Sequence, residues 1–115
     1  MRNFILIFSV IFIFVSCSVF TDIMIEKHFT SFAQDIDGIS TEEDLMNITE
    51  KWEKMSEFAE IIIDHGDLEE VSHHLWAMKE EIKYDYDEFM ESKALTKEML
   101  LHIRDRNTLG IINIL

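Results

Sequence analysis

The stretch that decides the fold is FILIFSVIFIFVSCSVF, from Phe4 to Phe20, which contains no charged residue. As a helix it spans about 26 Å, and continuing the helix to Ile25 reaches the roughly 30 Å of a bilayer's hydrocarbon core. Arg2 and the amino terminus put positive charge before the stretch, so the positive-inside rule predicts a cytoplasmic amino terminus. We therefore predict that residues 1–25 form a single-pass cell-membrane anchor, with residues 4–25 in the membrane. Residues 26–115 would form an extracytoplasmic domain.

Two other fates of this segment fit the residues. Val15-Ser16-Cys17-Ser18 resembles a lipobox, in which Cys17 would be acylated and become the new amino terminus. Phe14 fits poorly there, because an aliphatic side chain is usual three places before the cysteine. Simple cleavage after Ser18 is the third possibility. All three export the rest of the chain, and the uncleaved anchor fits best.

The exported part is strongly acidic. The chain has a net charge of −13, and nineteen acidic residues face only four basic ones between Asp35 and Glu91. Such a surface repels nucleic acid and anionic lipid headgroups, so neither is an expected partner. Cys17 is the single cysteine, so the chain cannot form an internal disulfide. The absence of proline and the small number of glycines favour helices.

Apolar spacing predicts two helices before residue 64. The first continues from the anchor and ends at Gly38, a natural carboxy-terminal cap, with one apolar face formed by Ile25, Phe29, Phe32 and Ile36. The second starts with a capping box between Ser40 and Glu43. Its apolar residues alternate spacings of three and four: Leu45, Ile48, Trp52, Met55, Ala59 and Ile62.

Two more helices follow a break at Asp64-His65-Gly66. Asp67 with Glu70 and Asp85 with Glu88 repeat the start signal. The expected core positions are Leu68, Val71, Leu75, Met78 and Ile82 in the third helix, and Phe89, Met90, Ala94, Met99, Leu100 and Ile103 in the fourth. The fold class predicted is therefore all-α, with a transmembrane helix followed by a small helical bundle. Because the connections are short, neighbouring helices should pack antiparallel.

Four short segments carry a family resemblance: Lys51-Trp52-Glu53-Lys54, Ile63-Asp64-His65, Leu101-His102-Ile103 and Asn113-Ile114-Leu115. Their order and spacing resemble the family catalogued as domain of unknown function 4363, which consists of short bacterial membrane-anchored proteins. The resemblance implies an uncleaved anchor and a helical exported domain, without an assigned activity. The chain departs from the family pattern at Gly66, Ala77 and Arg104.

One group of side chains has metal-ligand character: His65, Glu70, His73 and His74. Glu70 and His73 have the Glu-x-x-His spacing of di-iron carboxylate bundles, but those proteins need the motif twice. Glu98 and His102 would have to supply a second pair. A mixed histidine and carboxylate cluster would suit zinc or another transition ion. The simpler interpretation is that these are exposed residues of an acidic helix.

No nucleophile–base pair or phosphate-binding loop is recognisable, so we expect no enzymatic activity and no cofactor. We expect an accessory or scaffold protein that binds another membrane protein through its bundle. The contact surfaces would be the acidic face and the apolar tail from Ile111 to Leu115. The alternative is a metal-binding sensor or carrier. Self-association through the helix seams is a third possibility. Trp76 lies just off its seam. It could be a partly exposed contact anchor, but we expect it at the flank of the core.

Overall fold

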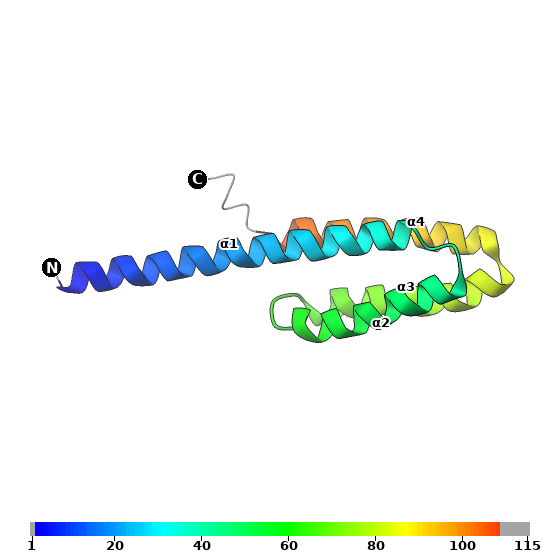
Figure 1. Cartoon of the computed structure of the whole chain (residues 1–115), viewed down its shortest axis with the longest axis horizontal. Coiled ribbons are helices and arrows are strands. Elements are labelled where there is room, and N and C mark those ends of the chain that lie inside the picture. Colours follow the sequence, from blue (N-terminus) through cyan, green and yellow to red (C-terminus); the bar gives the residue numbers. More distant parts are fainter. Residues whose placement is uncertain (1, 109–115) are drawn as a thin grey trace.

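The computed structural model describes residues 2–108 and contains four helices over that range, without strands. They are α1 (Arg2–Asp37), α2 (Glu42–Ala59), α3 (His65–Tyr84) and α4 (Tyr86–Asn107). Figure 1 shows one half of α1 projecting from the bundle and the other half lying beside α4. The all-α prediction, with a long apolar first helix followed by a helical bundle, is therefore confirmed.

The helices form a ring in which α1 and α3 each contact both α2 and α4. The α1–α4 contact is the most extensive of the four and the α1–α2 contact the smallest. Short connections make neighbouring helices antiparallel. As a result, the α2–α3 turn lies on the side of the projecting half of α1, and the α3–α4 connection lies at the opposite end (Figure 1).

The projecting half of α1 carries the apolar stretch. Its side chains from Phe4 to Phe14 are exposed. Among the described residues, α1 is the one helix long and apolar enough to cross a membrane. The same helix continues without a break into the bundle and ends at Gly38, as predicted. The Gly38 N–H donates to the carbonyls of Gln34 and Asp35, at 3.2 and 3.1 Å.

Trp52 of α2 occupies the centre of the core. Its ring meets Phe29 and Phe32 of α1 edge-on, with centroid distances of 6.2 and 5.6 Å. Its indole N–H donates to the Ser72 hydroxyl of α3, at 2.8 Å. Edge-to-face aromatic pairs contribute about 0.5–1.5 kcal/mol beyond their buried area. This side chain therefore joins three of the four helices.

The predicted core of α1, α2 and α3 is mostly confirmed. The buried residues include Ile25, Phe29, Phe32, Ile36, Leu45, Ile48, Trp52, Ala59, Leu68, Val71, Leu75 and Met78, with Met55 and Ile82 packed partly buried against them. Ile62 was wrongly assigned to the core. Because α2 ends at Ala59, the helical spacing no longer applies there, and Ile63 is buried instead.

The core face of α4 was predicted less well. Phe89, Leu100 and Ile103 are fully buried, but Met90 and Ala94 are exposed. Thr96 is buried in their place. Its hydroxyl donates to the Ser92 carbonyl at 2.7 Å, which lets a polar side chain occupy a core position. An apolar pattern could not identify such a residue.

Two helix starts differ from the prediction by one to three residues. The capping box of α2 joins Thr41 and Asp44 rather than Ser40 and Glu43. Helix α3 begins at His65, because Asp64 acts as its N-cap and accepts from the Gly66 N–H at 3.3 Å. The start of α4 is as predicted, with Asp85 accepting from the Glu88 N–H at 3.1 Å.

Candidate functional site

The four residues of the predicted metal site do not converge. His65, the first residue of α3, contacts Glu60 through Nδ1 at 3.2 Å and Glu69 through Nε2 at 3.0 Å. Both ring nitrogens therefore already face carboxylates on either side of the α2–α3 turn. Glu70 and His73 are exposed and His74 is half-buried.

Within residues 2–108, no group of three or more histidine, cysteine, aspartate or glutamate side chains is arranged to hold a metal ion. His73 instead lines a shallow open hollow of about 420 Å³ with Glu69, Ser72 and Trp76. Trp76 is 68% exposed, so the expected position at the core flank was wrong. It lies in the part of α3 that faces solvent, one residue beyond the buried Leu75.

A long hollow lies where the ring of helices is least tightly closed, between α1 and α2. It has a volume of about 580 Å³. One side is formed by α1 residues and the other by α2 residues: Met24, His28, Ser31, Phe32 and Asp35 from α1, and Lys51, Lys54, Met55 and Phe58 from α2. We call this hollow the α1–α2 groove.

The lining residues of the α1–α2 groove follow one stripe along each helix. On α2, Lys51, Lys54, Met55 and Phe58 are spaced by three, one and three residues, which places them on a single face. The groove therefore runs along the helix axes. At its base lies a narrow apolar crevice of about 20 Å³, which extends to Ile25, Ala59 and Ile63. The base is apolar and the rim is polar.

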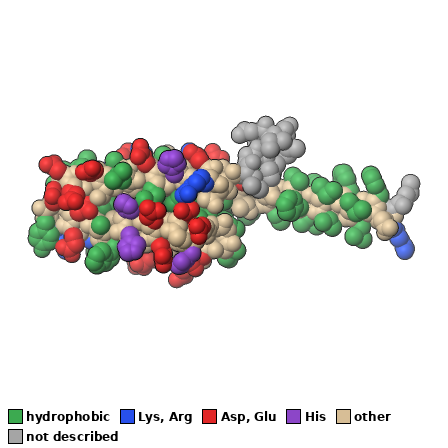
Figure 2. Space-filling model, turned by 180° about the vertical axis from the view of Figure 1, so that it is seen from behind, with side chains coloured by type: hydrophobic (Ala, Val, Ile, Leu, Met, Phe, Trp, Pro, Cys, Tyr) green, Lys and Arg blue, Asp and Glu red, His purple; other side chains and the backbone are tan. Residues whose placement is uncertain are grey.

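The charge of the groove differs from that of the rest of the bundle. Lys51 and Lys54 are two of the four basic residues between Asp35 and Glu91. Neither forms an ion pair within residues 2–108. By contrast, Lys97 pairs with Asp37 at 3.3 Å and Arg106 pairs with Asp67 at 3.2 Å. Figure 2 shows the contrasting acidic surface of the bundle, seen on one face of the molecule.

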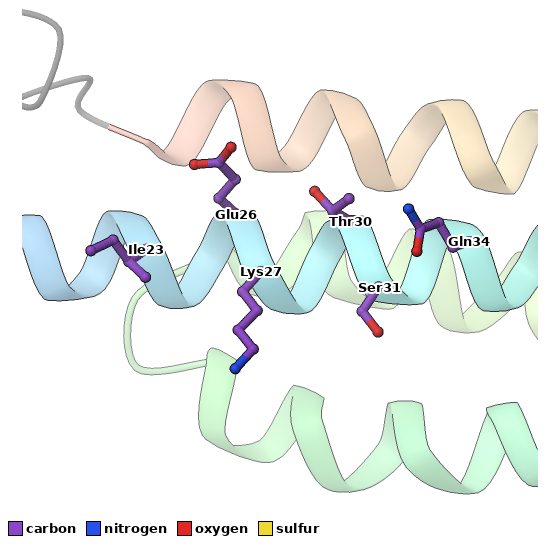
Figure 3. A pocket seen from close by; sticks show the side chains of 6 residues that line it. All are labelled: Ile23, Glu26, Lys27, Thr30, Ser31 and Gln34. Carbon is purple, nitrogen blue, oxygen red and sulfur yellow. The ribbon is translucent and has the colours of Figure 1, made fainter.

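A second open hollow of about 370 Å³ lies on the outward side of α1. Figure 3 shows its side chains on this one helix, with Glu26 directed toward α4 and Lys27 toward α2. Thr30 accepts a hydrogen bond from Arg104 Nη1 at 3.0 Å, which joins α1 to α4 on that side of the hollow. Ser31 also lines the α1–α2 groove, so the two hollows adjoin. Together they form one broad, shallow surface rather than an enclosed cavity.

A family model covers most of this structure. The family described as Domain of unknown function (DUF4363) matches residues 24–114. The chain belongs to this family. The DUF4363 region begins in α1 at Met24, the first α1 residue of the α1–α2 groove, and includes α2, α3 and α4 completely. Comparison with curated proteins and with solved structures found no match.

The segments that carry the DUF4363 resemblance have different structural roles. Lys51-Trp52-Glu53-Lys54 lies on α2, where Trp52 enters the core and the two lysines line the groove. Arg104, one of the departures from the family pattern, bonds Thr30 and pairs with Asp105 at 3.0 Å. The predicted contact tail from Ile111 to Leu115 lies outside the described residues.

Sequence reasoning did not identify the α1–α2 groove. The signal available was the position of Lys51, Lys54 and Phe58 beside the apolar seam of α2. That pattern shows which face flanks the core, but it does not show which neighbouring helix leaves the face uncovered. The difference arises because α1 packs most closely against α4, the helix farthest from it in sequence.

Proposed function

We propose that this DUF4363 protein is a membrane-anchored accessory or scaffold protein that binds another membrane protein through the α1–α2 groove. Helix α1 would hold the bundle at the membrane, with the bundle on the extracytoplasmic side. The groove itself is the observation that carries the proposal. It combines an apolar base with two lysines that lack an ion-pair partner within residues 2–108.

The shape of the site favours a protein as the ligand. Sites for small molecules are concave and bury most of the ligand surface, whereas this groove is open and continues into the hollow of Figure 3. An amphipathic helix placed in a groove of this kind buries residues at spacings of three and four. Because α1 continues from the apolar stretch into the groove, a partner helix leaving the membrane beside α1 would lie parallel to it.

Charge complementarity defines the expected partner further. A helix that places aspartate or glutamate beside its apolar stripe would pair with Lys51 and Lys54, which outnumber Asp35, the one acidic residue of the lining. Complementary charges at a rim mainly set partner choice and association rate. Basic partners would be attracted to the acidic remainder of the bundle but not to this groove.

The test is site-specific photo-crosslinking in intact membranes, with a photoreactive residue in place of Lys54 in the full-length chain. We expect one enriched membrane protein in the cross-linked product. The same replacement at Lys83, an exposed residue of α3, is the matched control. Cross-links that contain only this chain, or equal products from both positions, would contradict the proposal.

Charge reversal tests the role of the lysines. We expect Lys51→Glu with Lys54→Glu to reduce association by about tenfold, equivalent to about 1.4 kcal/mol. Lys79→Glu with Lys83→Glu changes the net charge equally on α3, and should leave association unchanged. The measurement is co-purification of the cross-linked partner in mild detergent. Equal losses in both double variants would show that only overall charge matters.

A further inference from the structure

The turn between α2 and α3 exposes a cluster of large apolar side chains. Phe58 is 61% exposed, Ile61 is 80% exposed and Ile62 is 43% exposed. The backbone here is tightly closed, since the N–H groups of Ile62 and Ile63 both donate to the Ala59 carbonyl, at 3.0 and 2.8 Å. Ile63 points into the core, so the neighbouring isoleucines are held outward. We call Phe58, Ile61 and Ile62 the apolar turn.

The position of the apolar turn along α1 is set by side-chain packing. Phe58, Ile62 and Ile63 line the same crevice as Met24 and Ile25 of α1. The turn is therefore level with this part of α1, on the side of the projecting apolar half (Figure 1). From Phe20, where the apolar stretch ends, to Ile25 the helix advances about 7.5 Å.

This height coincides with the surface of a bilayer. A bilayer about 40–45 Å thick with a hydrocarbon core of about 30 Å has a headgroup layer of about 5–7.5 Å on each side. If Phe20 marks the edge of the hydrocarbon core, the apolar turn lies at the outer limit of the headgroup layer. If the core instead extends to Ile25, as the length of the anchor requires, the turn lies at the inner limit of that layer. Both positions bring the turn to the bilayer surface. Exposed clusters of large apolar residues in this position are typical of contacts with protein or membrane.

We propose that the apolar turn inserts into the headgroup layer of the same membrane that α1 crosses. This inference rests on the proposed anchoring by α1, but not on the partner or on the α1–α2 groove. A second point of attachment fixes the rotation of the bundle about α1. It thereby holds the groove, which shares Phe58 with the apolar turn, at a defined height above the membrane.

The charges around the apolar turn specify the kind of lipid. Glu57, Glu60 and Asp64 flank it and are all exposed. Carboxylates this close to the membrane are repelled by anionic headgroups. The occupant is therefore a zwitterionic lipid surface, and an increasing fraction of anionic lipid should withdraw the turn from it.

The test uses fluorescence quenching by spin-labelled lipids in phosphatidylcholine vesicles that contain the full-length protein. Three single-cysteine variants in a Cys17→Ser background carry the same fluorophore: Ile61→Cys at the turn, Ile11→Cys in the apolar stretch and Tyr84→Cys at the opposite end of the bundle. We expect lipids labelled near the headgroup to quench the Ile61→Cys probe at least about threefold more than the Tyr84→Cys probe. Lipids labelled deep in the acyl chains should quench the Ile11→Cys probe.

The three probes separate the two proposals. Quenching at Ile11→Cys with none at Ile61→Cys would overturn the inference about the turn and leave the anchoring intact. An unquenched Ile11→Cys probe would overturn the anchoring. As a second variant, Ile62→Asp should reduce quenching of the Ile61→Cys probe to the level of the Tyr84→Cys control. Retention of full quenching in that variant would also overturn the inference.

Another occupant of the apolar turn would give a different result. A protein cover would protect the Ile61→Cys probe from both the lipid quencher and an aqueous quencher such as iodide. Dilution of the protein in lipid would then expose the probe if the cover were a second copy. Truncation after Thr108 would expose it if the cover were residues 109–115. Each of these outcomes contradicts insertion into lipid.

Discussion

Trp52 shows how much of this bundle depends on one residue. Its ring contacts two phenylalanines of α1 while its N–H bonds Ser72 of α3. Since the α1–α2 contact is the smallest in the ring, these aromatic contacts are a large part of what holds α1 and α2 together. The α1–α2 groove lies directly beside them, with Phe32 in its lining.

We expect Trp52→Ala to destabilise the bundle by about 3–5 kcal/mol, because it leaves a large cavity in the core. A small domain has about 5–15 kcal/mol of stability in total. Trp76→Ala is the matched control, and exposed positions of this kind usually change stability by about 0.5 kcal/mol or less. Thermal unfolding followed by circular dichroism measures both. Similar losses in the two variants would show that Trp52 is not the central contact.

At the scale of the helix, two starts place acidic residues in opposite electrostatic situations. Hydrogen bonds from the Ser40 backbone N–H and then from Thr41 lower the pKa of Asp44. A hydrogen bond with Asp85, followed by repulsion from Asp85 and Glu81, raises the pKa of Glu88. Ionised Asp44 therefore stabilises its helix start, whereas ionised Glu88 destabilises the start of α4.

The two shifts predict opposite pH effects. The contribution of Asp44 is present above its unfolded pKa of about 3.9 and is lost as pH falls through its lower folded value. The cost of Glu88 is present above its raised folded pKa and disappears below its unfolded value of about 4.3. At pH 7 we expect Asp44→Asn to lower the unfolding temperature slightly and Glu88→Gln to raise it slightly. The Glu88 difference should fade as pH falls below about 4.3, whereas the Asp44 difference should fade only at lower pH, through its lowered folded pKa. Shifts of the same sign at pH 7 would contradict the assignment.

The number of helices and most of their buried faces could be predicted from sequence, because apolar periodicity reports helix amphipathicity directly. The starts were less certain where several capping residues follow one another. Ser40 and Thr41 compete for one helix, and Asp64 and Asp67 for the next. Only the folded geometry decides which side chain reaches an N–H group. The α1–α2 groove could not be predicted, since it depends on unequal contacts between helices.

At the scale of the whole molecule, α1 belongs to two environments. Its apolar half projects outward, while buried residues of the bundle begin at Asp22 and Ile25. A boundary at residues 25 and 26 is useful for describing the anchor, but the packing of the bundle crosses it. Removal of the apolar segment should therefore be tolerated only if the cut leaves this packing in place.

We expect a fragment that starts at Thr21 to unfold cooperatively, because it keeps Ile25 and Phe29. A fragment that starts at Ser31 loses both side chains, and burial of each contributes about 1.5–3 kcal/mol. It also removes Phe29 from the Trp52 ring and Thr30 from Arg104. We expect this shorter fragment to show a broad, non-cooperative transition in circular dichroism. Equal unfolding temperatures for the two fragments would show that α1 contributes to the bundle only beyond Thr30. The folded domain would then begin farther along α1 than the packing of Ile25 and Phe29 indicates.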